Sequence, residues 1–255
     1  SGHILLVTGV SAKGDSGTIQ LDSGVATSGT SGSIVLAAGT GDYGGSVSLT
    51  AGETTTTSAA GGDISLTGGL GSDSGTSNGG KVVIRGGTSA GTSGNYGGDV
   101  DLASGYSTYG TGGSVNFRSG FSAATTSGDI LLATMNSAAA GVSGALFVST
   151  GAAVSGGSGS LNLLTGATSA GSAGSVSIYV GTSDEIATQE GGGIAVHAGQ
   201  SSGASGGVIL ISSGYGAATS SGTSTLRTAN AAGGGTSGFV LLLTGSSNGG
   251  DTGDI

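Results

Sequence analysis

Residues 61–69 read GGDISLTGG, and this stretch holds the pattern from which the rest of the chain is built. After Gly62, the apolar residues Ile64 and Leu66 alternate with polar ones, and the stretch ends on a small residue and a second glycine. Residues 44–52, GGSVSLTAG, and 31–39, SGSIVLAAG, follow the same order. A period of two is typical of an extended strand with one face covered, and Ile, Val and Leu suit such a strand.

The same unit returns along the whole chain, which makes this an internal-repeat protein. We call the seven residues that carry the alternation the apolar segment, the glycine before it the opening glycine, and the glycine at its end the closing glycine. The segments resume in phase after loops of different length, as stacked equivalent units would allow. The opening glycines are Gly2, Gly17, Gly32, Gly45, Gly62, Gly80, Gly98, Gly113, Gly128, Gly144, Gly159, Gly174, Gly192, Gly207, Gly222, Gly238 and Gly253.

These features predict an all-β fold, a parallel β-solenoid (β-helix) of about sixteen repeats of 15–18 residues, without disulfides and with uncapped ends. Residues 1–255 are expected to form a single solenoid domain, a segment of a longer array or filament. Glycines would occupy the corners, where positive φ costs them little. Apolar side chains would stack in ladders along the axis, for example Ile19, Ile34, Val47 and Ile64. An antiparallel meander is disfavoured because its hairpin loops are shorter than these.

Composition narrows the class of protein. The chain has 60 glycines, no proline and no cysteine among 255 residues, with 7% charged residues and a net charge of −9. Low charge argues against a disordered linker. The five basic residues are scattered, which argues against nucleic-acid binding, and no apolar run is long enough for membrane insertion. The bases are Lys13, Lys81, Arg85, Arg118 and Arg227.

The residues capable of chemistry do not form a recognisable site. Residues 39–44 match G-x-G-x-x-G but open no helix. His3 and His197 are too far apart in the repeat order for a triad or a metal cluster. Asp99 and Asp101 share a face, yet the calcium-binding repeat is not reproduced. The acidic loop with Asp184, Glu185 and Glu190 is interpreted as solvated. We therefore expect no enzyme activity, no cofactor and no metal.

Three aromatic residues directly follow a closing glycine and are candidate partner contacts. They are Tyr106, Phe121 and Tyr215. The favoured interpretation is that the rings stack on one another along the rod. The alternative is that they form an aromatic stripe that binds a partner or a sugar. Apolar residues at outward positions of the segments, such as Leu131 and Phe147, suggest lateral association.

The motifs GGDISLTGG, SGSIVLAAG and GGSVSLTAG resemble those of the repetitive Gly/Ser/Thr-rich β-solenoid proteins of microbial and algal cell surfaces. The resemblance implies an extracellular or cell-surface structural protein that forms fibres by end-to-end or lateral assembly. Its expected partners are copies of itself and surface glycans, with no nucleic acid. The alternatives are an ice-binding or carbohydrate-binding (adhesive) solenoid module, and a polysaccharide-active enzyme. The outward residue pairs are too irregular for an ice-binding array, and no clustered acid–base pair is visible for an enzyme.

Overall fold

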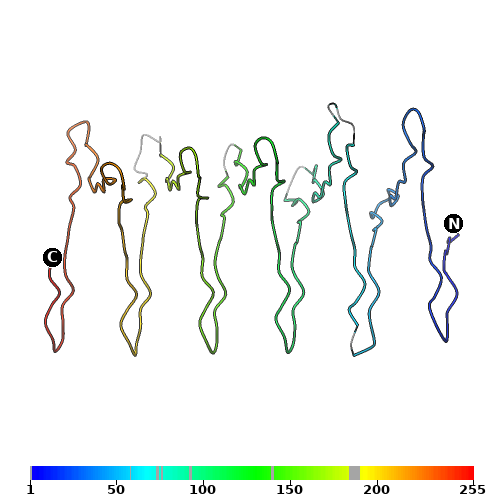
Figure 1. Ribbon diagram of the computed structural model, residues 1–255, viewed down its shortest axis with the longest axis horizontal. Helices are drawn as coiled ribbons and strands as arrows, with labels where there is room; N and C mark the ends of the chain where they lie inside the picture. Colours follow the sequence, from blue (N-terminus) through cyan, green and yellow to red (C-terminus); the bar gives the residue numbers. More distant parts are fainter. Residues whose placement is uncertain are drawn as a thin grey trace. The chain divides into compact units, whose positions relative to one another are not determined.

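The computed structural model describes residues 2–57, 59–72, 75, 77–91, 94–138, 141–183 and 190–255. These residues contain no helix and no β-strand. The chain is extended and irregular, and it turns in loops whose bends fall at places such as residues 12–14 and 27–29 (Figure 1). The fold is therefore a succession of extended apolar segments and loops.

The chain divides into two units, Ser1–Leu132 and Ala133–Ile255. The division falls inside the apolar segment that follows Gly128, and not in a loop between segments. The units therefore do not each contain a whole number of repeats. The single-domain organisation stays a prediction.

The prediction of a parallel β-solenoid is wrong. A solenoid needs backbone hydrogen bonds between the segments of successive coils. In the part of the chain that the structure describes, the backbone–backbone hydrogen bonds close loops and two tight turns, and none joins one apolar segment to another. The predicted ladders are absent for the same reason, since Ile19, Ile34 and Val47 are each about half exposed instead of stacked.

Seven loops are closed at their base by one backbone hydrogen bond. The N–H of the opening glycine donates to the carbonyl oxygen of the preceding closing glycine, over N···O distances of 2.8–3.1 Å. We call this base the loop neck. A closed neck removes the loop from the path between one apolar segment and the next. The bonded pairs are Gly62 with Gly52, Gly80 with Gly69, Gly98 with Gly87, Gly113 with Gly105, Gly128 with Gly120, Gly207 with Gly199, and Gly222 with Gly214.

The residue before the closing glycine is small in every bonded neck. In all seven bonded necks this residue is Ala, Ser or Gly, as at Ala51, Gly68 and Ser104. Wherever it is Thr, as at Thr150, no neck bond forms among the described residues. A β-branched side chain puts an additional methyl group beside the opening glycine and holds the two backbones apart. Nothing in the structure explains why the necks after Ser23 and Ala38 are also unbonded.

We expect Ser104→Thr to open the neck between Gly105 and Gly113. The added methyl group should remove a hydrogen bond that contributes about 1 kcal/mol, so that the Gly113 amide exchanges about fivefold faster. The measurement is amide hydrogen exchange by NMR. The reverse change, Thr150→Ser, should slow exchange at Gly159 by a similar factor.

The control is Ser114→Thr, which makes the same change at an exposed segment position beyond the neck. It should leave the Gly113 amide unaffected. Equal exchange at Gly113 in the native protein, the Ser104→Thr variant and the Ser114→Thr variant would contradict the steric explanation.

Candidate assembly surface

The loops carry their own side-chain caps. In four loops, a serine two residues after the closing glycine accepts a hydrogen bond from a backbone N–H three residues further on. Ser107 accepts from Gly110 at 2.9 Å, and Ser122 accepts from Thr125 at 3.0 Å. Ser201 and Ser247 accept at 3.0 Å from Ala204 and Gly250. Such serine turns give exposed loops a preferred bend. The sequence analysis missed these caps, although serine at a fixed distance from the closing glycine was a readable signal.

At several necks the opening glycine is needed for close approach, not for an unusual backbone angle. A methyl group on Gly45 would lie 3.0 Å from the Cβ of Ala38, and one on Gly113 would lie 3.2 Å from the Cβ of Ser104. Contacts of that length leave almost no room for a side chain. By contrast, a methyl group on the closing glycine Gly105 would meet nothing within 4 Å. The two glycines of the repeat therefore have different roles.

The expectation that corner glycines adopt positive φ is corrected by the structure. None of the opening glycines is among the residues found with positive φ. That backbone conformation occurs instead within the loops, as at Gly14 (φ 111°), Gly29 (φ 102°) and Gly156 (φ 104°). Glycine avoids the steric cost that other residues have there. The opening glycines and the positive-φ glycines within the loops thus meet two separate physical requirements.

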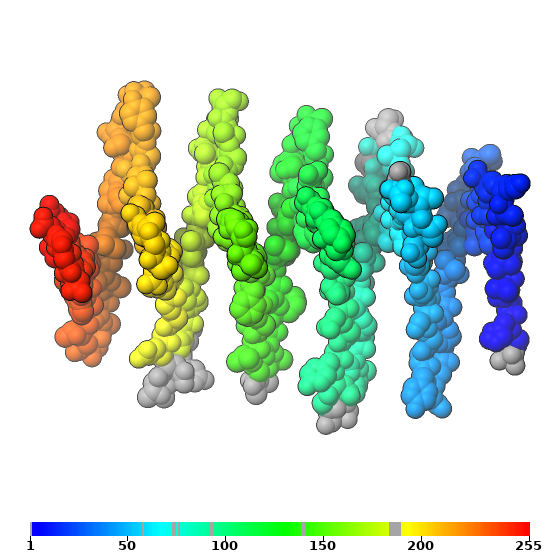
Figure 2. Space-filling view, turned by 90° about the horizontal axis from the view of Figure 1, so that it is seen from below, coloured from blue at the N-terminus to red at the C-terminus, as the bar shows by residue number. Residues whose placement is uncertain are grey.

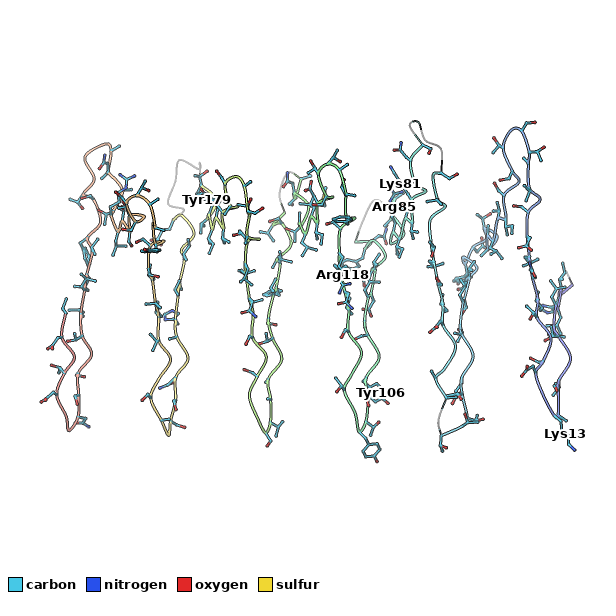
Figure 3. The ribbon with its side chains drawn as sticks, in the orientation of Figure 1. Lys13, Lys81, Arg85, Tyr106, Arg118 and Tyr179 are labelled. Carbon is cyan, nitrogen blue, oxygen red and sulfur yellow. The ribbon has the colours of Figure 1, made fainter. Side chains whose placement is uncertain are left out.

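The three candidate aromatic contacts lie on loops and are almost fully exposed. Tyr106, Phe121 and Tyr215 keep 92%, 90% and 90% of their surface accessible. Figure 3 shows Tyr106 standing on its loop, away from Lys81 and Arg85. The predicted stacking is not seen, because none of the three rings has a ring contact within the described residues. Their role as partner contacts stays a prediction.

The remaining polar candidates are not brought together. His3, His197, Asp99 and Asp101 are exposed, and the described residues hold no group of three potential metal ligands. Asp184 and Glu185 of the acidic loop lie outside the described residues, and Glu190 is exposed. Among the described residues, no helix is long and apolar enough to cross a membrane.

The most extensive surface feature is the row of paired apolar side chains. In most segments the first apolar position is about half exposed, as at Val100 and Val115 (49% and 48%), whereas Ile4 is 92% exposed. Outward apolar positions range from 58% exposed at Val83 to 89% at Phe147, so the period of two gives only a weak difference between the two sides of a segment. No residue is buried in the described part of the chain. Within Ser1–Leu132, the space-filling view shows narrow separate arms instead of a filled body (Figure 2).

No protein-family model, no curated protein and no solved structure matches this chain. The candidate assembly surface is defined by residues of this chain alone. It consists of the apolar segments, which present aliphatic side chains and unpaired backbone groups, and of the loop necks that connect them.

We expect Gly80→Ala to break its neck and Gly69→Ala to preserve it. The new methyl group on residue 80 would lie 2.8 Å from the Gly69 nitrogen, whereas one on residue 69 would meet nothing within 4 Å. Loss of the neck bond should speed amide exchange at position 80 by at least about fivefold. Hydrogen exchange measured by NMR on both variants checks this.

The pair Gly113→Ala and Gly105→Ala is an independent repeat of the comparison, at a neck with a shorter loop. If both variants of a pair changed the amide equally, the distinct roles of opening and closing glycines would be disproved.

Proposed function

We propose that the protein is a structural protein whose copies associate with one another side by side through their apolar segments and so form fibres. One observation carries the proposal, namely that two aliphatic side chains in almost every repeat remain exposed and no described residue is buried. Contact with another copy is the route by which these side chains leave water.

The total surface supports this argument. The chain exposes 24866 Å² for a mass of 23.3 kDa. A folded monomer of that mass exposes about 9,700 Å², and a fully extended chain about 34,000 Å². The excess over a folded monomer is several times the 1,200–2,000 Å² that a standard stable interface buries in total (about 1,600 Å²). The single chain therefore has ample surface for contacts with more than one neighbour.

Composition supports it as well. Charged residues make up 7% of the chain, and the mean hydropathy is +0.25. A chain that stays dispersed while exposing its backbone usually has low hydrophobicity and high charge. The segments also leave their backbone N–H and C=O groups without partners from other segments, and open edges of that kind favour pairing with a second chain.

The alternative functions have less support. Ice binding and carbohydrate binding were expected from a rigid, regular solenoid face, and the described residues form no sheet that would supply one. The extracellular or cell-surface location is a prediction that rests on the sequence resemblance.

We expect the triple variant Leu49→Ser, Leu66→Ser and Leu102→Ser to weaken self-association strongly. Each leucine contributes about 1.5–3 kcal/mol when fully buried, so that partial burial of all three should raise the dissociation constant by about a hundredfold or more. Sedimentation velocity over a concentration series, with electron microscopy of the assemblies, gives the measurement.

A matched control changes three loop residues of similar character, Val25→Ser, Leu70→Ser and Val154→Ser. These side chains are 94%, 90% and 108% exposed. This control should associate like the native protein. The proposal fails if the native protein is monomeric throughout the series, or if control and segment variants weaken association equally.

A further inference from the structure

Charged residues alternate in sign along five consecutive apolar segments of the unit Ser1–Leu132 and its border. The segment of residues 63–69 carries an acid, 81–87 carries two bases, 99–105 two acids, 114–120 one base, and 129–135 one acid. In chain order these residues are Asp63, Lys81, Arg85, Asp99, Asp101, Arg118 and Asp129. The bases, treated in the sequence analysis as scattered, thus follow an order that appears only when the chain is divided into segments.

All seven charged side chains are at polar positions of the alternation and are exposed. None forms an ion pair within the described part of the chain. Figure 3 shows Lys81 and Arg85 together on their segment, with Arg118 on a later one. The charges are therefore available to a partner and are not used within the chain.

The loops between these five segments are all closed at the neck. Gly80, Gly98, Gly113 and Gly128 each donate to the preceding closing glycine. Two of these loops contain ten residues and two contain seven. Because each loop is closed at its base, its length does not alter the path from one segment to the next. Successive charged segments can therefore lie at equal intervals. A second copy shifted by one repeat would then still place segment opposite segment.

Two alignments of a second copy have opposite electrostatic consequences. In register, Lys81 and Arg85 would face the same two bases of the second copy, and Asp99 and Asp101 would face the same two acids. Like charges placed opposite one another are destabilising. With a shift of one repeat, each charged segment meets a segment of opposite sign, which gives four complementary contacts in succession.

We infer that copies of this chain associate with a stagger of one repeat, so that residues 81–87 of one copy lie against residues 99–105 of the next. This inference rests on the proposed self-association and specifies its register. The stagger leaves a segment at each end free for a further copy. Such a head-to-tail contact does not close on itself and continues into a fibre.

The test is Asp99→Lys with Asp101→Lys in the full chain, at low ionic strength. The stagger predicts weaker association, by about tenfold, because two attractive pairs become repulsive. General charge repulsion predicts the reverse, since the variant reduces the net charge of −9. The control Asp15→Lys with Asp42→Lys makes the same change in net charge at exposed loop positions. It should associate as tightly as the native protein or more tightly.

Adding Lys81→Asp and Arg85→Asp to the Asp99/Asp101 variant restores both the native net charge and the opposition of signs at the central contact. It should recover part of the lost affinity, since Asp63 and Arg118 then face like charges. In register, this addition would only exchange one like-charge contact for another.

Salt separates this inference from the proposed function. Screening should weaken the native assembly if the stagger is correct, whereas an in-register assembly would tighten. Association that is insensitive to both charge variants, yet lost in the Leu49, Leu66 and Leu102 variant, would overturn the stagger and leave the proposed function intact. A native protein that stays monomeric would overturn both.

Discussion

The close approach of two backbones at the seven bonded loop necks is the constraint on which the local structure depends. It requires an opening glycine, because a methyl group at a position such as Gly113 would press on the preceding small residue. Every bonded neck also has Ala, Ser or Gly before its closing glycine, and no neck with Thr there is bonded among the described residues, although the necks after Ser23 and Ala38 are unbonded too. The opening glycine and the small residue before the closing glycine, which could be taken for mere compositional bias, are thus both related to this one contact.

That contact is local, and it explains why the described part of the chain has order in its loops without a buried core. A single hydrogen bond closes a loop of seven to ten residues, but it brings no second apolar segment against the first. Each repeat offers two aliphatic side chains for about fifteen ordered residues, too little apolar surface to offset the entropy of ordering them. In the proposed function, burial comes from contact with another copy, which links the neck to self-association.

The repeated division into segments and loops could be read from the sequence, whereas the fold could not. The alternation at Ile64 and Leu66 predicted a half-covered strand, but the described residues contain no strand and both side chains are more than half exposed. The opening glycines as corners stay a prediction, since bends fall within the loops, as at residues 12–14 and 27–29. The solenoid was a further step, because period-two alternation describes a segment and not its partner. The pattern in residues 61–69 does not indicate whether the segment that pairs with it belongs to the same chain or to another copy. The caps at Ser107 and Ser122 were missed because low-complexity loops hide positional order.

The charge order follows from the same separation of loop and segment. Read residue by residue, Lys81 and Asp99 lie eighteen positions apart, and Arg118 and Asp129 eleven, so no period appears. Read segment by segment, the signs alternate without exception over five units. A closed neck makes the second order the physically relevant one, since the loop residues no longer lie between the charges along the path. An association driven by apolar contact alone would have no preferred register. A few charges at polar positions supply one, because like signs face each other in one alignment and opposite signs in the next.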